Sequence, residues 1–336
     1  MIFFNNQEVK YIMSAVTFSG KENVNPNAYH TTKKQKTNHG SSFKIPEKFR
    51  PQFYLFKAIK DAIARKTPWD FTPMGNDETL WKEFLNYDFR SWVLEHSDEV
   101  DMVLLLQKGL TELPEELFLL TNLRVLRLAQ NAFQKLPEEL FSMTSLEKLD
   151  LSYNQLTALP KGMEKLINLK SLGVSNNPIE RFDLTLPKLT HLYLSDTDLT
   201  EVPNLQHLPL ENLWLTSNKI KKVDVGRFPS SIKVLRLSEN QIDSLSGPFE
   251  KLTVLDFLYL DENQLSTLPE AFSNLPKIRV LGMNQNAFNE VPKVLEKLSS
   301  LKQLYLRVNL LRVLPEWTNR LKDFSAENNP LDHLKC

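Results

Sequence analysis

The chain has 336 residues, 41% of them hydrophobic, and its 41 basic and 41 acidic side chains give a formal net charge of +0. This balance excludes a general electrostatic attraction to nucleic acid or acidic membranes, and no apolar run approaches the roughly 20 residues of a membrane-spanning helix. The single cysteine, Cys336, excludes an internal disulfide framework and a cysteine-based metal cluster. We therefore expect a folded protein without a cofactor.

Residues 1–46 predict a disordered, basic N-terminal tail. They are rich in Asn, Ser, Thr and Lys, and six Lys against two Glu give a local charge of +4. The first residues lack the apolar stretch of about 7–15 residues that a signal peptide needs. The chain also has no Asn-x-Ser/Thr glycosylation sequon. Together these features predict a cytoplasmic or nuclear protein.

Two short motifs lie within this tail. Residues 21–23, Lys-Glu-Asn, resemble the KEN-box degron that the anaphase-promoting ubiquitin ligase reads, and a chance match is the alternative. Residues 33–36, Lys-Lys-Gln-Lys, resemble a minimal basic nuclear-localisation signal, and a solvated charge cluster is the alternative. Both interpretations stay open for both motifs.

Residues 47–100 predict a helical cap. Apolar residues at three- and four-residue steps from Phe53 to Ile63 predict an amphipathic helix that ends before Pro68. Asp77 is a candidate N-cap for a second helix that carries Trp81, and a third helix is expected over residues 89–93. The aromatic residues of these helices form either a groove for a partner or the cap of a repeat array. We favour the cap because the segment directly precedes the first repeat.

One pattern recurs over residues 101–336. The stretch Leu146–Leu166 reads L-E-K-L-D-L-S-Y-N-Q-L-T-A-L-P-K-G-M-E-K-L, and ten such units follow one another at spacings of 20 to 23 residues. A short first unit, Met102–Pro114, precedes them, with Gly109 in the place of the Asn. The pattern resembles the leucine-rich repeat, whose units have about 20–29 residues. The ten units begin at Leu123, Leu146, Leu169, Leu189, Leu210, Ile232, Leu255, Ile278, Leu301 and Leu321.

The resemblance implies an α/β solenoid, a horseshoe whose parallel strands line the concave face behind an N-terminal helical cap. Each L-x-x-L-x-L segment is expected to form a short strand with its Leu side chains in the core. The Asn after each strand can satisfy buried backbone groups of the turn, and Thr197, which replaces it in one unit, can do only part of this. Leu-Pro pairs such as Leu159-Pro160 suit the outer return, where no ladder donor is required.

The repeats resemble two groups of leucine-rich repeats. Units with Leu-Pro-x-x-Leu and a 23-residue period are similar to the Ras-group-like repeats of intracellular signalling scaffolds. The central units that begin at residues 169, 189, 210 and 232 are shorter or lack the Leu-Pro pair, as at Phe182-Asp183, Val223-Asp224 and Leu245-Ser246, and are similar to the repeats of regulatory subunits that bind protein phosphatase 1. The resemblance implies a non-catalytic scaffold or regulatory subunit whose partner is a phosphatase, a small GTPase or a ubiquitin-ligase component. A targeting or substrate-adaptor subunit of a ubiquitin ligase, or of a separate phosphatase, cyclase or nuclease, is the alternative.

The candidate binding site lies on the strand positions that face away from the core. With positions four and six of each unit buried, positions three, five and seven point outward. Several of these carry Tyr, Trp or Arg, the residue types enriched at binding hot spots, and packing on neighbouring strands is the alternative explanation. Acidic residues at positions seven and eight, Asp196, Glu239, Asp261 and Glu262, suit a partner that carries Lys or Arg. The candidate site consists of His191, Tyr193, Trp214, Arg236, Phe257, Tyr259, Asp261 and Tyr305.

An enzyme is the competing class of function. The six histidines do not have the spacing of metal ligands, and the sequence contains no Walker loop, no Gly-x-Gly-x-x-Gly and no Gly-x-Ser-x-Gly motif. We therefore expect no catalytic residue and no metal site.

The last unit, which begins at Leu321, reaches Cys336 without a polar capping helix. This predicts an exposed last coil that frays or pairs with a second copy of the chain to give a weak homodimer. A truncated gene product explains the ending equally well.

Overall fold

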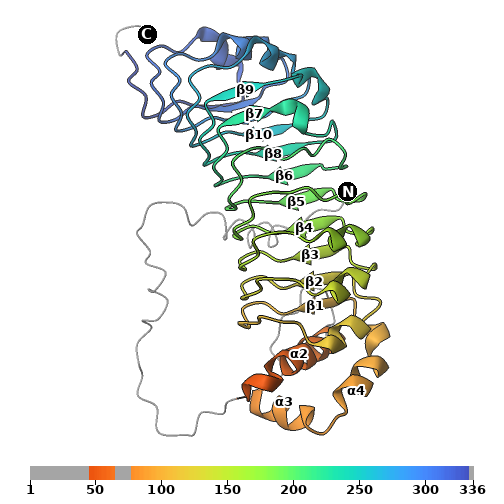
Figure 1. Ribbon diagram of the computed structural model, residues 1–336. Helices are drawn as coiled ribbons and strands as arrows, with labels where there is room; N and C mark the ends of the chain where they lie inside the picture. Colours follow the sequence, from red (N-terminus) through yellow and green to blue (C-terminus); the bar gives the residue numbers. More distant parts are fainter. Residues whose placement is uncertain (1–44, 65–76, 333–336) are drawn as a thin grey trace, which may run out of the picture. The chain divides into compact units, whose positions relative to one another are not determined.

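The computed structural model describes residues 45–64 and 77–332, which belong to one compact unit, Ile45–Cys336. Within these residues helices lie at one end and a long parallel sheet follows them (Figure 1). The tail motifs at residues 21–23 and 33–36, and Pro68, lie outside the described residues.

Eleven strands form the main sheet, in which each strand is parallel to the strand of the next unit. Every strand after the first begins two residues after a predicted unit start, so the ten predicted starts are confirmed. The central residue of the first ten of these strands, usually Leu, is buried, as the period of two predicts, whereas Phe324 of the last strand is partly buried. The strands are β1 Met102–Leu104, β2 Val125–Arg127, β3 Lys148–Asp150, β4 Ser171–Gly173, β5 His191–Tyr193, β6 Asn212–Trp214, β8 Val234–Arg236, β10 Phe257–Tyr259, β11 Val280–Gly282, β12 Gln303–Tyr305 and β13 Asp323–Ser325.

The first unit differs from the prediction in register. Met102 pairs with Val125, so Lys108, and not Gly109, takes the place of Asn131 in the next unit. The unit is therefore as long as its neighbour and is not shortened. Gly109 follows with φ 65, a left-handed conformation that glycine adopts without a steric cost. Asn131 Oδ1 accepts the backbone N–H of Lys108 at 3.0 Å, so the amide of the next coil serves this turn.

The recurring Asn joins neighbouring coils, as the sequence predicts. Asn154 Nδ2 donates to the carbonyls of Leu128 (3.1 Å) and Leu151 (2.9 Å), and its Oδ1 accepts the N–H of Phe133 (3.1 Å). Each amide thus satisfies backbone groups that would otherwise be buried without a partner. The same type of bonding recurs at Asn131, Asn177, Asn218, Asn240, Asn263 and Asn309.

Thr197 forms only some of the hydrogen bonds that an Asn forms in the other coils, as expected. Its hydroxyl lies within hydrogen-bond distance of two acceptors, the carbonyl of Leu194 (3.2 Å) and Oδ1 of Asn218 (2.7 Å). A hydroxyl has a single proton, whereas an amide donates twice. The coil at Thr197 therefore depends on Asn218 of the following coil, which also accepts the N–H groups of Thr197 and Leu199.

The outer return of six units starts at the proline of a Leu-Pro or Val-Pro pair. In each, the Pro is the residue before a short 3₁₀ helix, and its carbonyl accepts the N–H three residues later, as Pro160 does from Met163 at 3.0 Å. Proline suits this place because the first turn of a helix leaves its own N–H without a partner. The helices are η5 Glu115–Leu119, η6 Glu138–Ser142, η7 Lys161–Lys165, η10 Glu270–Asn274, η11 Lys293–Lys297 and η12 Glu316–Arg320.

Two central units have Asp224 and Ser246 in place of the proline of this pair and form a second, two-stranded parallel sheet, although Pro248 still precedes the 3₁₀ helix of the second unit. It consists of β7 Lys222–Asp224 and β9 Ser244–Ser246, followed by η8 Val225–Arg227 and η9 Phe249–Lys251. Without proline the backbone N–H groups are free to pair in a ladder. The sequence showed the missing Leu-Pro pairs, but we did not predict this second sheet from them.

The N-terminal helices form a cap with an aromatic core. Phe53 and Phe56 are fully buried, and the rings of Phe56 and Trp92 lie 4.8 Å apart. Helix α2 packs beside β1 and so covers the first edge of the sheet, which protects it from pairing with another chain. Asp77 is the first residue of α3 and pairs with Lys57 at 2.5 Å, so it is not the N-cap that we predicted. The helices are η3 Glu47–Phe49, α2 Arg50–Ala64, α3 Asp77–Phe84, α4 Phe89–Glu95 and η4 Ser97–Glu99.

Candidate functional site

The centre of the sheet carries four large side chains in one row. The strand register aligns Tyr193, Trp214, Arg236 and Tyr259 at position five of four adjacent strands. The rings of Tyr193 and Trp214 meet edge to face with centroids 4.6 Å apart. The guanidinium carbon of Arg236 lies 5.2 Å from the Trp214 centroid and 4.5 Å from the Tyr259 centroid. We call these four residues the aromatic–arginine row.

Glycines border the aromatic–arginine row on both sides. Gly173 pairs with Tyr193, and Gly282 pairs with Tyr259. A Cβ at Gly282 would lie 2.6 Å from Oδ2 of Asp261 and 3.0 Å from the Tyr259 ring. Position five therefore carries no side chain directly beside either end of the row, and the row is a discrete feature of the sheet.

The four side chains of the row are half-buried, because neighbouring side chains cover part of each one. Burial raises the pKa of the Tyr259 hydroxyl, so this tyrosine is neutral at physiological pH. Edge-to-face rings and an arginine above a ring face are favourable contacts of about 0.5–1.5 kcal/mol each. The row is therefore held in place by its own contacts before any partner arrives.

Acidic residues follow the strands at position eight. Asp196, Glu239 and Glu262 have φ of 50, 56 and 56, so each occupies the left-handed turn after its strand. Burial, followed by the like charges of Asp198 and Glu239, raises the pKa of the Asp196 carboxyl. Ser217, at the same position of the intervening coil, donates to Glu239 at 2.8 Å. We call Asp196, Glu239 and Glu262 the acidic border.

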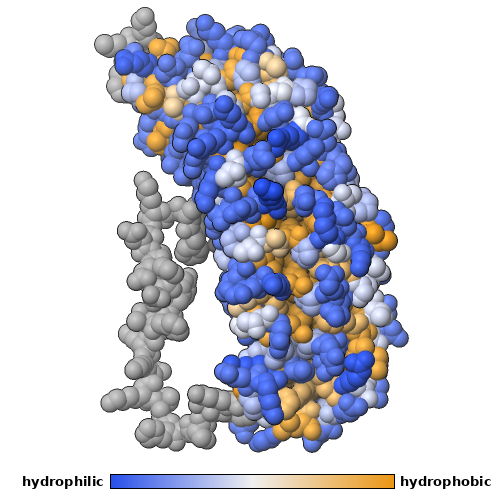
Figure 2. Space-filling model, in the orientation of Figure 1, coloured by the Kyte–Doolittle hydropathy of each residue, from blue (hydrophilic) through white to orange (hydrophobic). Residues whose placement is uncertain are grey.

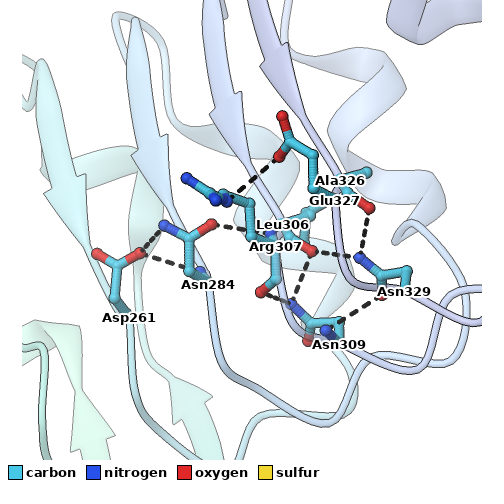
Figure 3. A network of polar contacts seen from close by, with 8 residues as sticks. All are labelled: Asp261, Asn284, Leu306, Arg307, Asn309, Ala326, Glu327 and Asn329. Atoms are coloured by element: carbon cyan, nitrogen blue, oxygen red, sulfur yellow. Dashed lines mark hydrogen bonds and ion pairs between the residues drawn. The ribbon is translucent and has the colours of Figure 1, made fainter. Parts of the chain in front are cut away.

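Asp261 points into a polar network with Asn284 (Figure 3). Its Oδ1 accepts the backbone N–H of Asn284 (2.9 Å) and Nδ2 of the same residue (2.7 Å). Asn284 Oδ1 in turn accepts the N–H of Arg307 (2.8 Å), whose side chain pairs with Glu327 at 3.3 Å. Burial raises the pKa of Asp261. These contacts join four successive coils, which is a structural role.

The other predicted site residues have neighbours of their own. Phe257 precedes Tyr259 by two residues, and its ring lies below the guanidinium of Arg279 at 5.7 Å. Tyr305 lies beyond Gly282 and donates its hydroxyl to Asp323 at 2.7 Å, which raises the pKa of Tyr305 to about 12. Four of the eight predicted residues thus form one contiguous group.

His191 lies on β5, two residues before Tyr193. Asn212 Nδ2 lies 3.1 Å from its Nε2 and the hydroxyl of Thr190 lies 2.9 Å from its Nδ1. Burial lowers the pKa of His191, so the ring is neutral and its Nε2 can accept the amide proton. These partners make His191 a positioned surface residue beside the row.

Position seven differs from the prediction in the central coils. Ser195 and Thr216 are only 8% exposed, although we expected this position to face solvent. The chain already turns toward the Asn ladder there, and small hydroxyl residues fit under the turn. The outward face of the central coils is therefore limited to positions three and five, with the acidic border beside them.

A row of ion pairs at position two was not predicted. Glu147 pairs with Lys170 (2.8 Å), Glu211 with Lys233 (2.9 Å), and Asp256 with Arg279. Aligning the units would have shown these alternating charges, because position two repeats in register. Exposed ion pairs of this kind each contribute little to stability. We therefore infer that their role is to favour the correct register between neighbouring strands.

Other kinds of site find no support in the described part of the chain. Among residues 45–64 and 77–332, no three His, Cys, Asp or Glu side chains are placed to hold a metal ion. No helix in these ranges has the length and apolar content needed to span a membrane. Polar side chains cover most of the face seen in Figure 2, with apolar side chains visible between them.

The similarity to a known family lies in the repeats. The model of the family described as leucine rich repeat matches residues 121–179, 146–199 and 208–265. No curated protein matches the sequence.

Several solved structures are similar over most of this chain. A leucine-rich-repeat protein of Leptospira interrogans is 26% identical, with a TM-score of 0.64, over 73% of this chain and 71% of that one. TLR13, solved in complex with ssRNA13, is 27% identical with a TM-score of 0.62, over 73% of this chain but only 39% of TLR13. The leucine-rich repeat domain of LRIM1 is 22% identical over 66% of this chain and 71% of that one, with a TM-score of 0.53, and shows the fold alone.

Proposed function

We propose that this leucine-rich-repeat protein is a non-catalytic scaffold or regulatory subunit that binds a protein partner on the concave face of its sheet. Leucine-rich-repeat solenoids generally bind partners through such extended concave surfaces. The observation that carries the proposal is the aromatic–arginine row. Its four side chains are in contact with one another on the outward face of adjacent strands. Trp, Tyr and Arg dominate the binding energy of protein interfaces.

The row is suited to binding because it is preorganised. Its side chains stand on strands that are fixed by the ladder and by buried leucines on either side, such as Leu213 and Leu215. Side chains that are already ordered lose less conformational entropy when a partner binds. A partner that covers Trp214 and Tyr193 therefore gains apolar burial at a low entropic cost.

The acidic border favours a protein partner over a nucleic acid. TLR13 was solved with a single-stranded RNA, but affinity for RNA depends largely on Lys and Arg that neutralise phosphates. Here Asp196, Glu239 and Glu262 lie beside the row, and the chain has a net charge of +0. A protein segment whose Lys or Arg side chains reach the acidic border complements this surface.

Within this function we favour a regulatory subunit in the cytoplasm or nucleus. Tyr193, Trp214 and Arg236 lie in central units that are shorter than 23 residues or lack the Leu-Pro pair, and such units resemble the repeats of phosphatase-binding regulatory subunits. A phosphatase, a small GTPase and a ubiquitin-ligase component remain the three partner classes. Identifying the bound partner by mass spectrometry separates them.

Site-specific photo-crosslinking tests the proposal. A photoreactive phenylalanine analogue replaces Tyr193 in one variant and Asn274, which is exposed on η10 of the outer return, in a control variant. After irradiation in cells, we expect discrete crosslinked proteins from position 193 and none of them from position 274. The same crosslinked proteins from both positions, or none from position 193, would refute binding on the sheet face.

A further inference from the structure

We infer that Arg236 is the anchor for a carboxylate of the bound partner, so that the recognised segment carries an Asp or Glu between apolar side chains that cover Trp214 and Tyr259. This inference rests on the proposed function, because it names the chemistry that the aromatic–arginine row recognises.

Arg236 has aromatic contacts on both sides but no counter-ion. In the described part of the chain its guanidinium contacts the rings of Trp214 and Tyr259, and its buried Nε has no hydrogen-bond partner. By contrast, Arg279, which also lies over a ring, pairs with the carboxylate of Asp256 through two nitrogens. Among the described residues, Arg236 is thus an arginine of the sheet face that has ring contacts and no salt bridge.

The environment of Arg236 favours binding of an anion from the partner. A partly buried charge is costly unless it is paired and hydrogen-bonded. Exposed arginines such as Arg181 and Arg312 can rely on water, whereas Arg236 is half-buried between rings. A partner that covers the row also removes water from the guanidinium, and only an anion supplied by that partner then satisfies it. The planar guanidinium matches a carboxylate with two parallel hydrogen bonds.

The neighbouring charges favour a carboxylate over a phosphate. The acidic border and Asp261 surround the row with negative charge on the side where the strands end. A phosphate group carries close to two negative charges at neutral pH, so it meets stronger repulsion there than a singly charged carboxylate does. We therefore expect a segment with one acidic residue at Arg236 and basic residues toward the acidic border.

A peptide selection provides the probe for the experiment. A phage-displayed library of random linear peptides is selected on the full chain and counter-selected on the Trp214→Ala variant, so that only peptides that require the row remain. We expect the enriched peptides to share one Asp or Glu flanked by apolar residues. An enriched set without a shared acidic position would overturn the inference.

A double-mutant cycle then tests the pairing directly. The affinity of the best peptide and of its Glu→Gln (or Asp→Asn) analogue is measured on the wild type and on Arg236→Met. Charged hydrogen bonds in interfaces correspond to at least about tenfold in affinity, so the analogue should bind the wild type about tenfold more weakly and lose this difference on Arg236→Met. A loss that is equal on both proteins would overturn the inference.

Arg279→Met is the matched control, because Arg279 also lies over an aromatic ring but already pairs with Asp256. It should leave the effect of the carboxylate unchanged. Circular dichroism confirms that each variant is folded, and Arg236→Lys, which keeps the charge but not the planar fork, should restore only part of the effect. Full restoration by lysine would overturn the two-bond pairing.

The results distinguish a failure of binding at the aromatic–arginine row from a failure of the Arg236–carboxylate pairing alone. If no selected peptide requires Trp214, binding at the row fails and the proposed function fails with it. If peptides require Trp214 but bind independently of their carboxylate, the proposed function stands and the role of Arg236 is overturned.

Discussion

Replacing Asn218 with Ala should destabilise the protein by about 3–5 kcal/mol. Asn218 is only 7% exposed and serves two coils. Its Nδ2 donates to the carbonyls of Leu194 (2.7 Å) and Leu215 (3.1 Å), and its Oδ1 accepts the N–H (3.2 Å) and hydroxyl (2.7 Å) of Thr197. Each hydrogen bond contributes about 0.5–1.5 kcal/mol, and each buried group left without a partner costs about 1–3 kcal/mol. The loss should be large because the coil at Thr197 lacks an amide of its own.

Urea unfolding followed by circular dichroism measures this effect, with the midpoint and the slope reported together because repeat arrays can lose cooperativity. Gln241→Ala, an exposed amide on the next coil, is the control and should change stability by less than about 0.5 kcal/mol. Asn218→Asp keeps an acceptor but loses both donated bonds, so its cost should also exceed that of the control. Equal stability of Asn218→Ala and Gln241→Ala would refute the ladder as a source of stability.

Three further predictions concern single residues. Val308 has φ 54, a conformation that is strained for a β-branched residue, so Val308→Asn should raise the melting temperature, and a lower value would contradict the assignment of strain. Gly247 has φ 102, and a Cβ there would clash with Oδ1 of Asp224, whereas Gly109 has φ 65 and open space around it. Gly247→Ala should therefore lower the free energy of unfolding in urea by about 1–3 kcal/mol more than Gly109→Ala does. Equal losses for the two variants would show that the contact with Asp224 relaxes. The pKa of Tyr305 is about 12, above its ordinary value of 10.0, because its hydroxyl donates to Asp323. The stability from this bond is present below the unfolded pKa and lost as the pH rises through the folded pKa; ultraviolet titration should show one tyrosine whose pKa falls in Asp323→Asn, and an unchanged titration would exclude the bond.

The sequence predicted the solenoid well because its signal is local and repeated. Apolar residues, mostly leucine, recur at positions four and six of the units, so the strand starts could be located to the residue. The Asn ladder could also be predicted, because an amide is the side chain that both donates twice and accepts in a buried turn. Even the partial substitute at Thr197 follows from the number of its protons.

Contacts that depend on register and side-chain direction could not be predicted. The sequence placed Arg236 between aromatic residues, but not its contact with both rings or the absence of a counter-ion. It also placed Asp261 among the candidate binding residues, whereas the structure turns this carboxylate toward Asn284. These outcomes depend on rotamers and on polar partners from neighbouring coils, which a single unit does not encode.

The binding surface was predicted in part for the same reason. Strand parity identifies which residues face outward, and so the row of Tyr193, Trp214, Arg236 and Tyr259 could be found from the sequence. Parity fails where the strand ends, because Ser195 and Thr216 at position seven are buried under the turn. The boundary of the surface was therefore less accurate than its centre.

The affinity of the crosslinked partner for Trp214→Ala tests whether the aromatic–arginine row is the binding site. Trp317→Ala is the matched control, since Trp317 also lies beside an arginine, at 5.2 Å from Arg320, but belongs to η12 of the outer return. Calorimetry with the purified partner should show a loss of about 2 kcal/mol, or roughly thirtyfold, for Trp214→Ala and no loss for the control. An unchanged affinity of a folded Trp214→Ala variant would contradict the assignment of the aromatic–arginine row as the binding site.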